Sequence, residues 1–600
     1  DRGAADAGHA DDSALLGIYS RLLSPFLQSR GRAWLVLAAV GLLFLVAASL
    51  PVFRAVPLKL LPYDNKNEIQ VVIDMPESSS LENTAAVAES VGKIAARLPE
   101  VRAVAAFVGT PSPIDFNGMV RRYYQRSAPH VADLRLTLVD KDEREHQSHA
   151  VVMRLRDLLE PMNAGDARIK VVEVPPGPPV LSTLVAEIHA DTLVPYQAQR
   201  DAAGLVMERL AREPHVVEVD STVEHPQQRL RFIADKQKAA LSGISTEDIN
   251  SSLALANAGA TAGDLQLPRE TRPLPIELRL DVDQRASLTD FNRLRIKGRA
   301  GIAQQSTPQG LETAAQPLVS LGELGHFERQ AADQAIHRKD LRPVVYVTAE
   351  LNGRTPAEVI ADVNADLGRT PSEPGGEAPG WASRNFLAAG GGDGWTVPEG
   401  IDVKWTGEGE WRITVRVFRD MGLAFAFALM AIFFVLRLQT ASTTLSLIIM
   451  SSIPLTIIGI MPGFWMMNQF GERVIAGAPD PVMFTATAMI GMIALAGIVV
   501  RNSLILVEFI TQARSAGLAL KDALLQAGAV RMRPVLLTAG TTMLGNLIIT
   551  LDPVFSGLAL AIIFGIVAST LFTLLVVPVV YLLVFERQAA AGPENEGTPP

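Results

Sequence analysis

The sequence predicts an α+β membrane protein with six transmembrane helices, one followed by five, and a large extracytoplasmic domain of ferredoxin-like βαβ units. Three observations lead to this fold class. A charge-free apolar run from Ala33 to Phe53 is just long enough to cross a bilayer once. Residues 55–410 then have a soluble composition and contain two similar strand–helix–strand patterns. Charge-free apolar segments fill most of residues 411–586, where the other helices are expected.

The composition favours a mixed membrane and soluble protein and excludes several classes. The 600-residue chain is 48% hydrophobic, has a formal net charge of -9 and contains no cysteine. The negative charge argues against nucleic acid as the main partner, and the lack of cysteine excludes a thiolate metal site. Because no H-E-x-x-H, G-x-S-x-G or Walker pattern is present, we expect neither an enzyme nor a cofactor.

Residues 1–32 are expected to form a linker and an interfacial helix. Residues 1–13 are small and acidic, which is typical of a disordered segment. From Leu15 to Leu27, apolar residues recur at helical spacing, which suits either an amphipathic helix on the membrane surface or a short helix packed on a soluble domain. The first transmembrane helix is placed at residues 33–54. Since the chain starts without Met or a signal-peptide pattern, we expect a fragment of a longer protein.

The soluble region contains an internal duplication. The motif A-R-x-P-x-V-x-x-V occurs at residues 96–104 and again at 211–219, each time where a predicted helix gives way to a strand. The first unit is expected at residues 55–180, and the second at 181–220 and 341–410. The predicted strands are Ile69–Met75, Val101–Val108, Leu134–Val139 and Ile169–Val174 in the first unit, and Leu184–His189, Val216–Val219, Val344–Leu351 and Ile401–Trp405 in the second.

Residues 221–340 interrupt the second unit and are interpreted as an inserted subdomain. They contain a predicted strand at Leu230–Ala234 and a capping-box helix start at Ser245 with Asp248. A hairpin-like stretch follows from Gly259 to Leu280. The subdomain is therefore expected to fold from its own short strands and helices.

Five further transmembrane helices are expected within residues 411–586. Basic residues cluster in the 512–534 connection and at Arg437, so both are predicted to be cytoplasmic and the large domain extracytoplasmic. Residues 369–400, rich in Gly, Pro and Ser, are predicted to form a mobile loop, and residues 587–600 a disordered tail. The charge-free segments are Met421–Leu436, Leu438–Gly471, Pro481–Val500, Val535–Leu551 and Pro553–Phe585.

An arginine lies inside one apolar segment. Arg501 falls within Pro481–Thr511, and a cation at membrane depth costs about 2.5–3.5 kcal/mol on insertion scales. It either faces a protein interior or wet cavity, or marks the cytoplasmic helix end and snorkels. No carboxylate lies in mid-membrane, so an acidic partner is either Glu508 or a residue outside this chain. The same helix carries small residues at every third position, which would allow another helix to approach: Ala488, Gly491, Ala494 and Gly497.

The next helix has a polar face. Thr538 and Thr542 are four residues apart, and Asn502 follows Arg501 on the preceding helix. Such a face serves either as hydrogen-bonding contact between helices or, beside an intramembrane arginine, as a proton relay. We predict a relay formed by Arg501, Thr538, Asn502 and Thr542.

Aromatic and apolar residues in one soluble loop are candidates for substrate binding. The loop runs from Gly109 to His130 between two predicted strands and would line a pocket for apolar ligands, although ordinary packing under a loop gives the same pattern. The methionines of the soluble region are interpreted as core filler rather than metal ligands. The substrate-binding candidates are Phe107, Phe116, Met119, Tyr123 and Tyr124.

Two sequence stretches resemble a known family. GMIALAGIVVRNSLILVEF, followed by VRMRPVLLTAGTTMLGN, is similar to the fourth and fifth helices of the C-terminal half of resistance-nodulation-division (RND) efflux permeases. The fuller similarity is to the acriflavine-resistance, hydrophobe/amphiphile branch. The resemblance extends from about Leu15 to Phe585 and includes the layout of one helix, a large domain and five helices.

The resemblance implies a proton-driven secondary transporter of the bacterial inner membrane, with its large domain in the periplasm. Such a pump is a homotrimer that exports hydrophobic or amphiphilic compounds such as drugs, together with a periplasmic adaptor and an outer-membrane channel. The N-terminal half of the same permease would be the chain's first partner. A heavy-metal or lipid-exporting branch is an alternative, although the lack of cysteine and scarcity of histidine speak against metals. A membrane-embedded sensor or scaffold that reuses the fold is a rival of another class.

The resemblance also assigns roles to individual residues. Arg501 occupies the basic position of the family's relay, which is often Lys and pairs with acidic residues on a helix of the N-terminal half. Since Arg stays protonated, it would be a fixed charge that tunes those acids. Thr538 matches the relay-associated threonine. Residues 109–130 fall at the family's substrate-contacting switch loop, but the aromatic spacing differs.

By the same resemblance, residues 55–180 correspond to the first porter subdomain, and 181–220 with 341–410 to the second. Residues 221–340 correspond to the docking subdomain. These assignments remain expectations from the family pattern.

Overall fold

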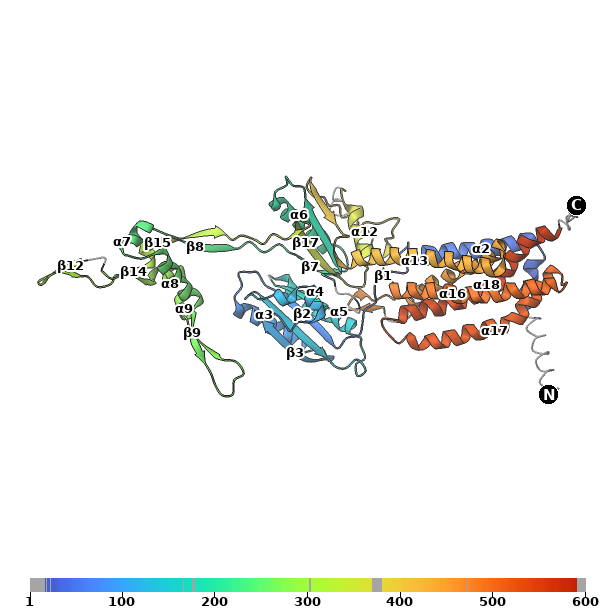
Figure 1. Ribbon diagram of the computed structural model, residues 1–600, viewed down its shortest axis with the longest axis horizontal. Helices are drawn as coiled ribbons and strands as arrows, with labels where there is room; N and C mark the ends of the chain where they lie inside the picture. The colour runs from blue at the N-terminus through green and yellow to red at the C-terminus, as the bar shows by residue number, and fades with distance from the viewer. Residues whose placement is uncertain are drawn as a thin grey trace. The chain divides into compact units, whose positions relative to one another are not determined.

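The structure is a computed structural model that forms two compact units, residues 1–223 with 336–600 and residues 224–335 (Figure 1). The predicted linker at 1–13, part of the interfacial helix and most of the C-terminal tail lie outside the described residues. The described residues are 17, 19–21, 23–165, 167–174, 177, 180–301, 304–369, 380–471 and 473–590.

Among the described residues, five helical segments are long and apolar enough to cross a membrane, against the six expected. The remaining predicted span, 535–551, falls largely within a 30-residue helix, α17 (Leu520–Ile549), which packs against its neighbours in the bundle. Arg533, three threonines and Asn546 make it less apolar than the others. The five segments are α2 (Arg30–Ser49), α13 (Gly409–Thr440), α14 (Thr443–Met450) continued through η4 (Pro454–Thr456) into α15 (Ile457–Met467), α16 (Ala486–Ser515) and α18 (Ser556–Ala590).

The predicted cytoplasmic connection at 512–534 is mostly helical, which corrects the sequence-based boundary. Helix α16 continues to Ser515 and α17 begins at Leu520, so only residues 516–519 lie between them. Arginine and lysine are good helix formers, and a loss of apolarity therefore marks the edge of the hydrocarbon layer rather than the end of a helix. Helix α13 likewise begins at Gly409, well before its charge-free segment.

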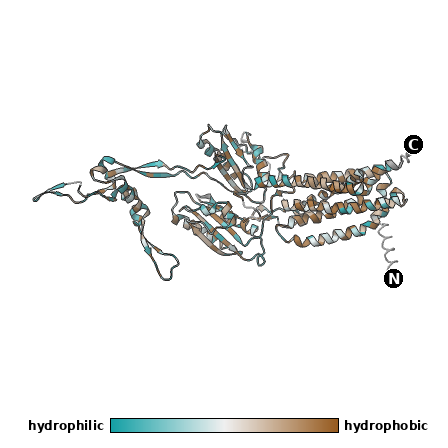
Figure 2. Ribbon diagram, in the orientation of Figure 1, coloured by the Kyte–Doolittle hydropathy of each residue, from teal (hydrophilic) through white to brown (hydrophobic). Residues whose placement is uncertain are grey.

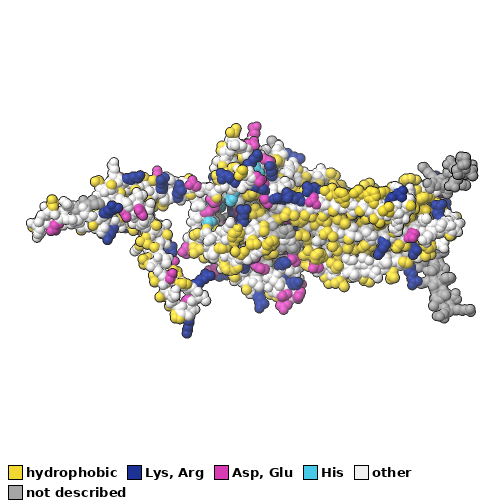
Figure 3. All heavy atoms as spheres, viewed as in Figure 1, with side chains coloured by type: hydrophobic (Ala, Val, Ile, Leu, Met, Phe, Trp, Pro, Cys, Tyr) yellow, Lys and Arg dark blue, Asp and Glu magenta, His cyan; other side chains and the backbone are white. Residues whose placement is uncertain are grey.

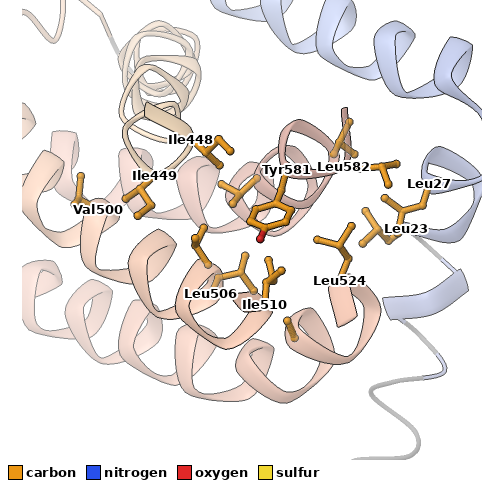
Figure 4. Packing of buried hydrophobic residues seen from close by; sticks show 14 of the residues in the cluster. Leu23, Leu27, Ile448, Ile449, Val500, Leu506, Ile510, Leu524, Tyr581 and Leu582 are labelled. Atoms are coloured by element: carbon orange, nitrogen blue, oxygen red, sulfur yellow. The ribbon is translucent and has the colours of Figure 1, made fainter. Parts of the chain in front are cut away.

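The helices pack around a shared apolar core, and hydrophobic residues also cover much of their outer surface (Figures 2 and 3). The N-terminal segment belongs to this core, because the Tyr19 hydroxyl donates to the Leu574 carbonyl at 2.7 Å. The Tyr19 ring occupies the space that a Cβ on Gly528 would need. Figure 4 shows the packing of Leu23, Leu27, Ile448, Ile449, Val500, Leu506, Ile510, Leu524, Tyr581 and Leu582.

The first sheet follows the β-α-β-β-α-β order of a split βαβ fold. Its elements are β2 (Glu68–Asp74), α3 (Leu81–Ala95), β3 (Val101–Val108), α4 (Phe116–Val120), η1 (Tyr123–Gln125), β4 (Val131–Leu138), α5 (Ser148–Leu159), η2 (Glu160–Ala164) and β5 (Arg168–Val172). The strands are antiparallel neighbours in the order β3-β4-β2-β5, and α3 and α5 pack on them. Alternating apolar residues such as Val71, Ile73, Leu134 and Leu136 are fully buried in this core, as strand periodicity predicts.

The second sheet repeats this topology. Its elements are β6 (Leu184–Ala190), α6 (Tyr196–Ala211), β7 (Val216–Ser221), β16 (Arg338–Lys339), β17 (Arg342–Leu351), α12 (Pro356–Asp366), η3 (Trp381–Ser383) and β18 (Ile401–Lys404). Strands β7, β17, β6 and β18 pair in that order. The duplicated motif makes the same turn in both sheets, since Val101 N donates to Leu98 O at 3.0 Å and Val216 N to Glu213 O at 3.2 Å. All eight predicted strands are confirmed to within three residues at each end.

The second unit has its own small core of Ile244, Ile249, Ile296, Leu321 and Leu324. The predicted strand, capping box and hairpin are confirmed in β8, α8 and the β9–β10 pair. Its elements are β8 (Gln228–Ala234), α7 (Lys236–Leu241), α8 (Thr246–Ala258), β9 (Ala260–Leu265), β10 (Leu274–Leu278), α9 (Val282–Arg285), α10 (Leu288–Arg293), β11 (Arg295–Lys297), β12 (Gln304–Thr307), β13 (Gly310–Thr313), β14 (Leu318–Ser320), α11 (Leu321–Leu324) and β15 (Gly325–Ala331).

The predicted mobile loop at 369–400 is partly wrong. Residues 370–379 lie outside the described residues, but the glycine run that follows is held against the end of α12. Gly390 N donates to Asp362 Oδ1 at 3.0 Å, and Gly391 N donates to Asp366 Oδ2 at 2.8 Å. Trp395 Nε1 donates to the Val363 carbonyl at 2.7 Å. Buried carboxylates thus supply acceptors for a backbone that composition alone marks as flexible.

Candidate functional site

Arg501 lies on an exposed face of α16. Residues Ile490, Ala494, Gly497, Arg501 and Glu508 are all exposed, and their helical spacing places them on one side of the helix. In the part of the chain that the structure describes, Arg501 has no hydrogen bond and no ion pair. Arg501 is therefore an exposed cation with no described partner, and Glu508, about two turns further along, is the other charged residue named on this face.

The small-residue pattern of α16 serves two surfaces. Gly491 is buried, and a Cβ there would lie 2.7 Å from the Leu558 carbonyl of α18. Gly497 has nothing within 4 Å of the corresponding position, and Ala494 is exposed. Gly491 allows α18 to approach closely, whereas the helix surface at Ala494 and Gly497, beside Arg501, is open.

The other predicted relay residues do not contact Arg501 through any hydrogen bond among the described residues. Asn502 is buried in the bundle. The Thr538 hydroxyl donates to Val535 O at 3.0 Å, and the Thr542 hydroxyl donates to Thr538 O at 2.8 Å, both within α17 itself. The hydroxyls of Thr538 and Thr542 are thus satisfied by the backbone of α17 itself, and the relay remains a prediction.

The predicted substrate loop has a polar anchor and an apolar exposed side. The Asp115 carboxylate accepts from Gly118 N at 2.5 Å and from Arg135 Nη1 at 2.5 Å, which fixes the start of α4. Among the candidates, Phe116 is 65% exposed and Met119 50% exposed. Tyr124 is also exposed, Tyr123 is half-buried, and Phe107 is half-buried near the end of β3, just before the loop.

A set of ion pairs that the sequence did not reveal joins the two sheets. Arg156 Nε lies 2.9 Å from Glu218 Oε1, and Arg121 Nη1 lies 3.4 Å from Glu350 Oε1. Arg168 and Lys170 both pair with Asp220. In each of these pairs the cation comes from the part of the chain that forms the first sheet and its helices, and the carboxylate from the part that forms the second. The two apolar cores are separate clusters, and these ion pairs link the parts of the chain that hold them.

Asp74, on β2 of the first sheet, forms ion pairs with Arg126 and with Lys170, one of the cations at this contact. Burial alone would raise the pKa of Asp74, but Lys170 and Arg126 outweigh it and lower that pKa to about 2. Burial alone would lower the pKa of Lys170, but Asp220 and Asp74 raise it above its ordinary value. Both groups therefore stay charged throughout the physiological range.

Replacing Asp74 with Asn is expected to destabilise the protein at neutral pH and less in acid. The carboxylate's stabilising effect is present above its ordinary pKa and is lost as pH falls from about 4 towards 2, because the folded-state pKa is the lower one. The effect should be about 2 kcal/mol at pH 7 and about half of that at pH 3, measured by thermal unfolding in detergent. Asp157→Asn, at an exposed position on α5, is the matched control. An Asp74→Asn effect that is equal at the two pH values would contradict this account.

Comparison with known proteins gives distant but extensive similarity. The swarming motility protein SwrC of Bacillus subtilis is 23% identical over 394 residues, covering 64% of this chain and 32% of that protein. The nickel and cobalt resistance protein CnrA of Cupriavidus metallidurans is 22% identical over 533 residues, covering 86% and 44%. The cobalt-zinc-cadmium resistance protein CzcA of the same organism is 24% identical over 385 residues, covering 63% and 31%. The chain spans less than half the length of these relatives.

Structural similarity extends over almost the whole chain. The crystal structure of a heavy metal efflux pump (crystal form II) matches with a TM-score of 0.72 and 17% identity, covering 96% of this chain and 53% of that one. At this identity the match shows a shared fold. The AcrB/AcrD/AcrF family model matches residues 13–382 and 394–585. The resemblance drawn from the membrane helices is confirmed, and the chain belongs to the AcrB/AcrD/AcrF family of RND permeases.

Proposed function

We propose that this chain is the C-terminal half of a proton-driven efflux transporter, with its helices in the bacterial inner membrane and its sheets in the periplasm. Family membership supports the transporter class. The observation that carries the proton-coupling proposal is the exposed, unpaired Arg501 on α16, among the residues that the structure describes.

An uncovered arginine at this depth requires a partner. The cost of leaving it in hydrocarbon is about 2.5–3.5 kcal/mol or more, and an opposing carboxylate offsets that cost. Because Ala494 and Gly497 leave space beside it, a helix of the N-terminal half would bring acidic side chains close to Arg501. Protonation and deprotonation of those acids beside a fixed positive charge would then drive the cycle, with Thr538, Asn502 and Thr542 as auxiliary polar groups.

We assign hydrophobic or amphiphilic compounds as the substrate class. The support is the exposed apolar side of the loop at 109–130, with Phe116 and Met119 on α4. A second candidate, export of divalent metal ions, is favoured by the relatives CzcA and CnrA, whose names refer to cobalt, zinc, cadmium and nickel.

The assembly is part of the same proposal. RND permeases generally form trimers that work with an adaptor and an outer-membrane channel, and we extend that arrangement to this chain. Residues 55–180, and 181–220 with 341–410, would be the porter subdomains. Residues 221–340 would dock the channel and adaptor.

Reconstitution of the intact permease tests the function. In proteoliposomes with an inward proton gradient, we expect an amphiphilic dye to be exported and the gradient to dissipate faster when the dye is present. Proton flux stimulated by Zn²⁺, Co²⁺ or Ni²⁺ instead would support the metal candidate. No substrate-dependent proton flux with either class would contradict transport and support the sensor or scaffold.

Replacing Phe116 and Tyr123 with Ala is expected to change the range of exported compounds more than proton coupling. The two side chains lie on α4 and η1, away from the membrane helices that carry the predicted relay. Export of bulky aromatic compounds should fall several-fold while smaller amphiphiles are affected little, measured as minimum inhibitory concentrations across a compound panel. Leu193→Ala, at an exposed position in the turn between β6 and α6, is the control. A uniform loss across all compounds would count against the substrate role.

A further inference from the structure

The start of α16 is hydrogen-bonded to the segment that enters the first sheet. Strand β1 (Leu58–Lys59) pairs in parallel with β21 (Phe484–Thr485), and Ala486 N donates to Leu60 O at 3.0 Å. Residues 484–485 lead directly into α16, on which Arg501 lies about 22 Å further along the helix axis. A shift of α16 along its axis would therefore move the backbone of Lys59.

The Lys59 side chain extends into a buried stack of rings. It is 6% exposed, and its Nζ lies 3.4 Å from the centre of the Tyr63 ring. The Tyr63 ring stacks on His149 with centroids 3.4 Å apart and an angle of 11° between the planes. His149 Nδ1 lies 2.8 Å from Glu173 Oε2. Through this stack, the position of Lys59 is linked to α5, the helix that carries His149 and Arg156.

A small charged cavity extends from this stack to the contact between the sheets. Its volume is about 80 Å³, enough for a few water molecules. Among the described residues that line it, Glu410 Oε1 and Glu173 Oε1 are buried without a hydrogen-bond partner, as expected for groups that bind water. The charged residues that line the cavity include Lys59, Arg121, Arg156, Glu173, Glu350 and Glu410.

The charges around the cavity keep Lys59 protonated. Burial lowers the pKa of Lys59, but Tyr63, Glu410 and Glu173 together raise it above its ordinary value. Arg121 and Arg156, on the same cavity, form the ion pairs that hold the first sheet to the second. Water in the cavity can take up the hydrogen bonds that these ion pairs release, so their rearrangement opens no apolar core.

Resting on the proposed proton-driven function, we propose that Lys59 is a positioning residue that transmits displacement of α16 to the contact between the two sheets. When α16 shifts, Lys59 moves relative to Glu410 and Glu173, and the ion pairs around the shared cavity rearrange. Protonation events beside Arg501 thereby change the separation of the sheets.

The experiment measures that separation in the intact permease in proteoliposomes. Since this chain has no cysteine, Asp157→Cys and Glu208→Cys place spin labels at exposed positions on α5 and α6, with any cysteine elsewhere in the protein replaced. Distances are recorded with and without an inward proton gradient, and dye export is measured in parallel. Lys59→Met removes the charge, Lys59→Arg keeps it, and Lys141→Met is a control at an exposed lysine. The double variant Lys59→Met/Glu410→Gln avoids an unpaired buried charge if Lys59→Met alone fails to fold.

We expect the gradient to produce a second distance in the unaltered protein, in Lys59→Arg and in Lys141→Met. Lys59→Met and the double variant should show one distance and about tenfold lower export. A gradient-dependent second distance in either of those variants would overturn the coupling role while leaving the proposed function intact. Loss of the second distance in Lys59→Arg would also overturn it. A gradient response that is absent from the unaltered protein, or unchanged in Arg501→Ala, would instead overturn the proposed function and this inference with it.

Discussion

Replacing Arg501 with Ala is expected to abolish proton-driven export by the intact permease while leaving its assembly in the membrane unchanged. The Arg501 side chain is exposed in this half and has no hydrogen bond to other described residues, so its removal breaks no contact within the chain. Under the proposed mechanism, it would leave acidic residues of the N-terminal half without their cation. Losing one partner of a buried charge pair costs about 2–5 kcal/mol, which corresponds to a loss of export of about thirtyfold or more.

The matched variants separate charge from packing. Arg501→Lys keeps a cation and should retain part of the export activity, whereas Arg501→Met keeps the volume and should not. Arg533→Ala removes an exposed cation from the next helix and should have little effect. Export is measured as dye efflux with an imposed proton gradient, and assembly by size-exclusion chromatography in detergent. Unchanged export in Arg501→Ala would show that the relay does not involve this residue.

The strand and helix pattern was readable because it depends on local periodicity. Strands such as Ile69–Met75 alternate or are continuously apolar, and the duplicated motif marks the same turn twice. The position of Arg501 in an apolar run was equally visible. Its exposure was not, because exposure depends on which side of α16 the rest of the bundle covers. That information lies in long-range packing.

The charged residues that join the sheets could not be paired from the sequence. Arg156 and Glu218 are 62 residues apart, and Arg121 and Glu350 are 229 residues apart, so no spacing rule relates them. In the sequence, each of these four residues has the pattern of an ordinary surface charge, and only the folded structure brings the pairs together. The same holds for Lys59, whose partners Glu173 and Glu410 lie more than 100 residues further along the chain.

The largest effect on stability is expected for Asp362→Ala, which should prevent the folded protein from accumulating. Asp362 is fully buried on α12 and accepts hydrogen bonds from Arg54 at 2.8 and 2.9 Å. Arg354 donates to it at 2.8 Å and Arg384 at 3.2 Å. Its removal would leave several buried guanidinium groups short of a counter-charge, and breaking one such pair alone costs about 3–5 kcal/mol.

Asp362→Asn tests whether charge or shape is responsible. Asparagine keeps the volume and one acceptor but removes the negative charge, so we expect an intermediate loss in the yield of monodisperse protein and in its melting temperature. Asp402→Ala, at a 64% exposed carboxylate on β18, should match the unaltered protein. If Asp362→Ala were as stable as Asp402→Ala, the prediction would be wrong, and the arginines that donate to Asp362 would be stabilised by other acceptors. Because Arg54 follows α2 and Gly390 belongs to the glycine run, this one carboxylate joins the first membrane helix, the second sheet and a loop that composition marked as mobile.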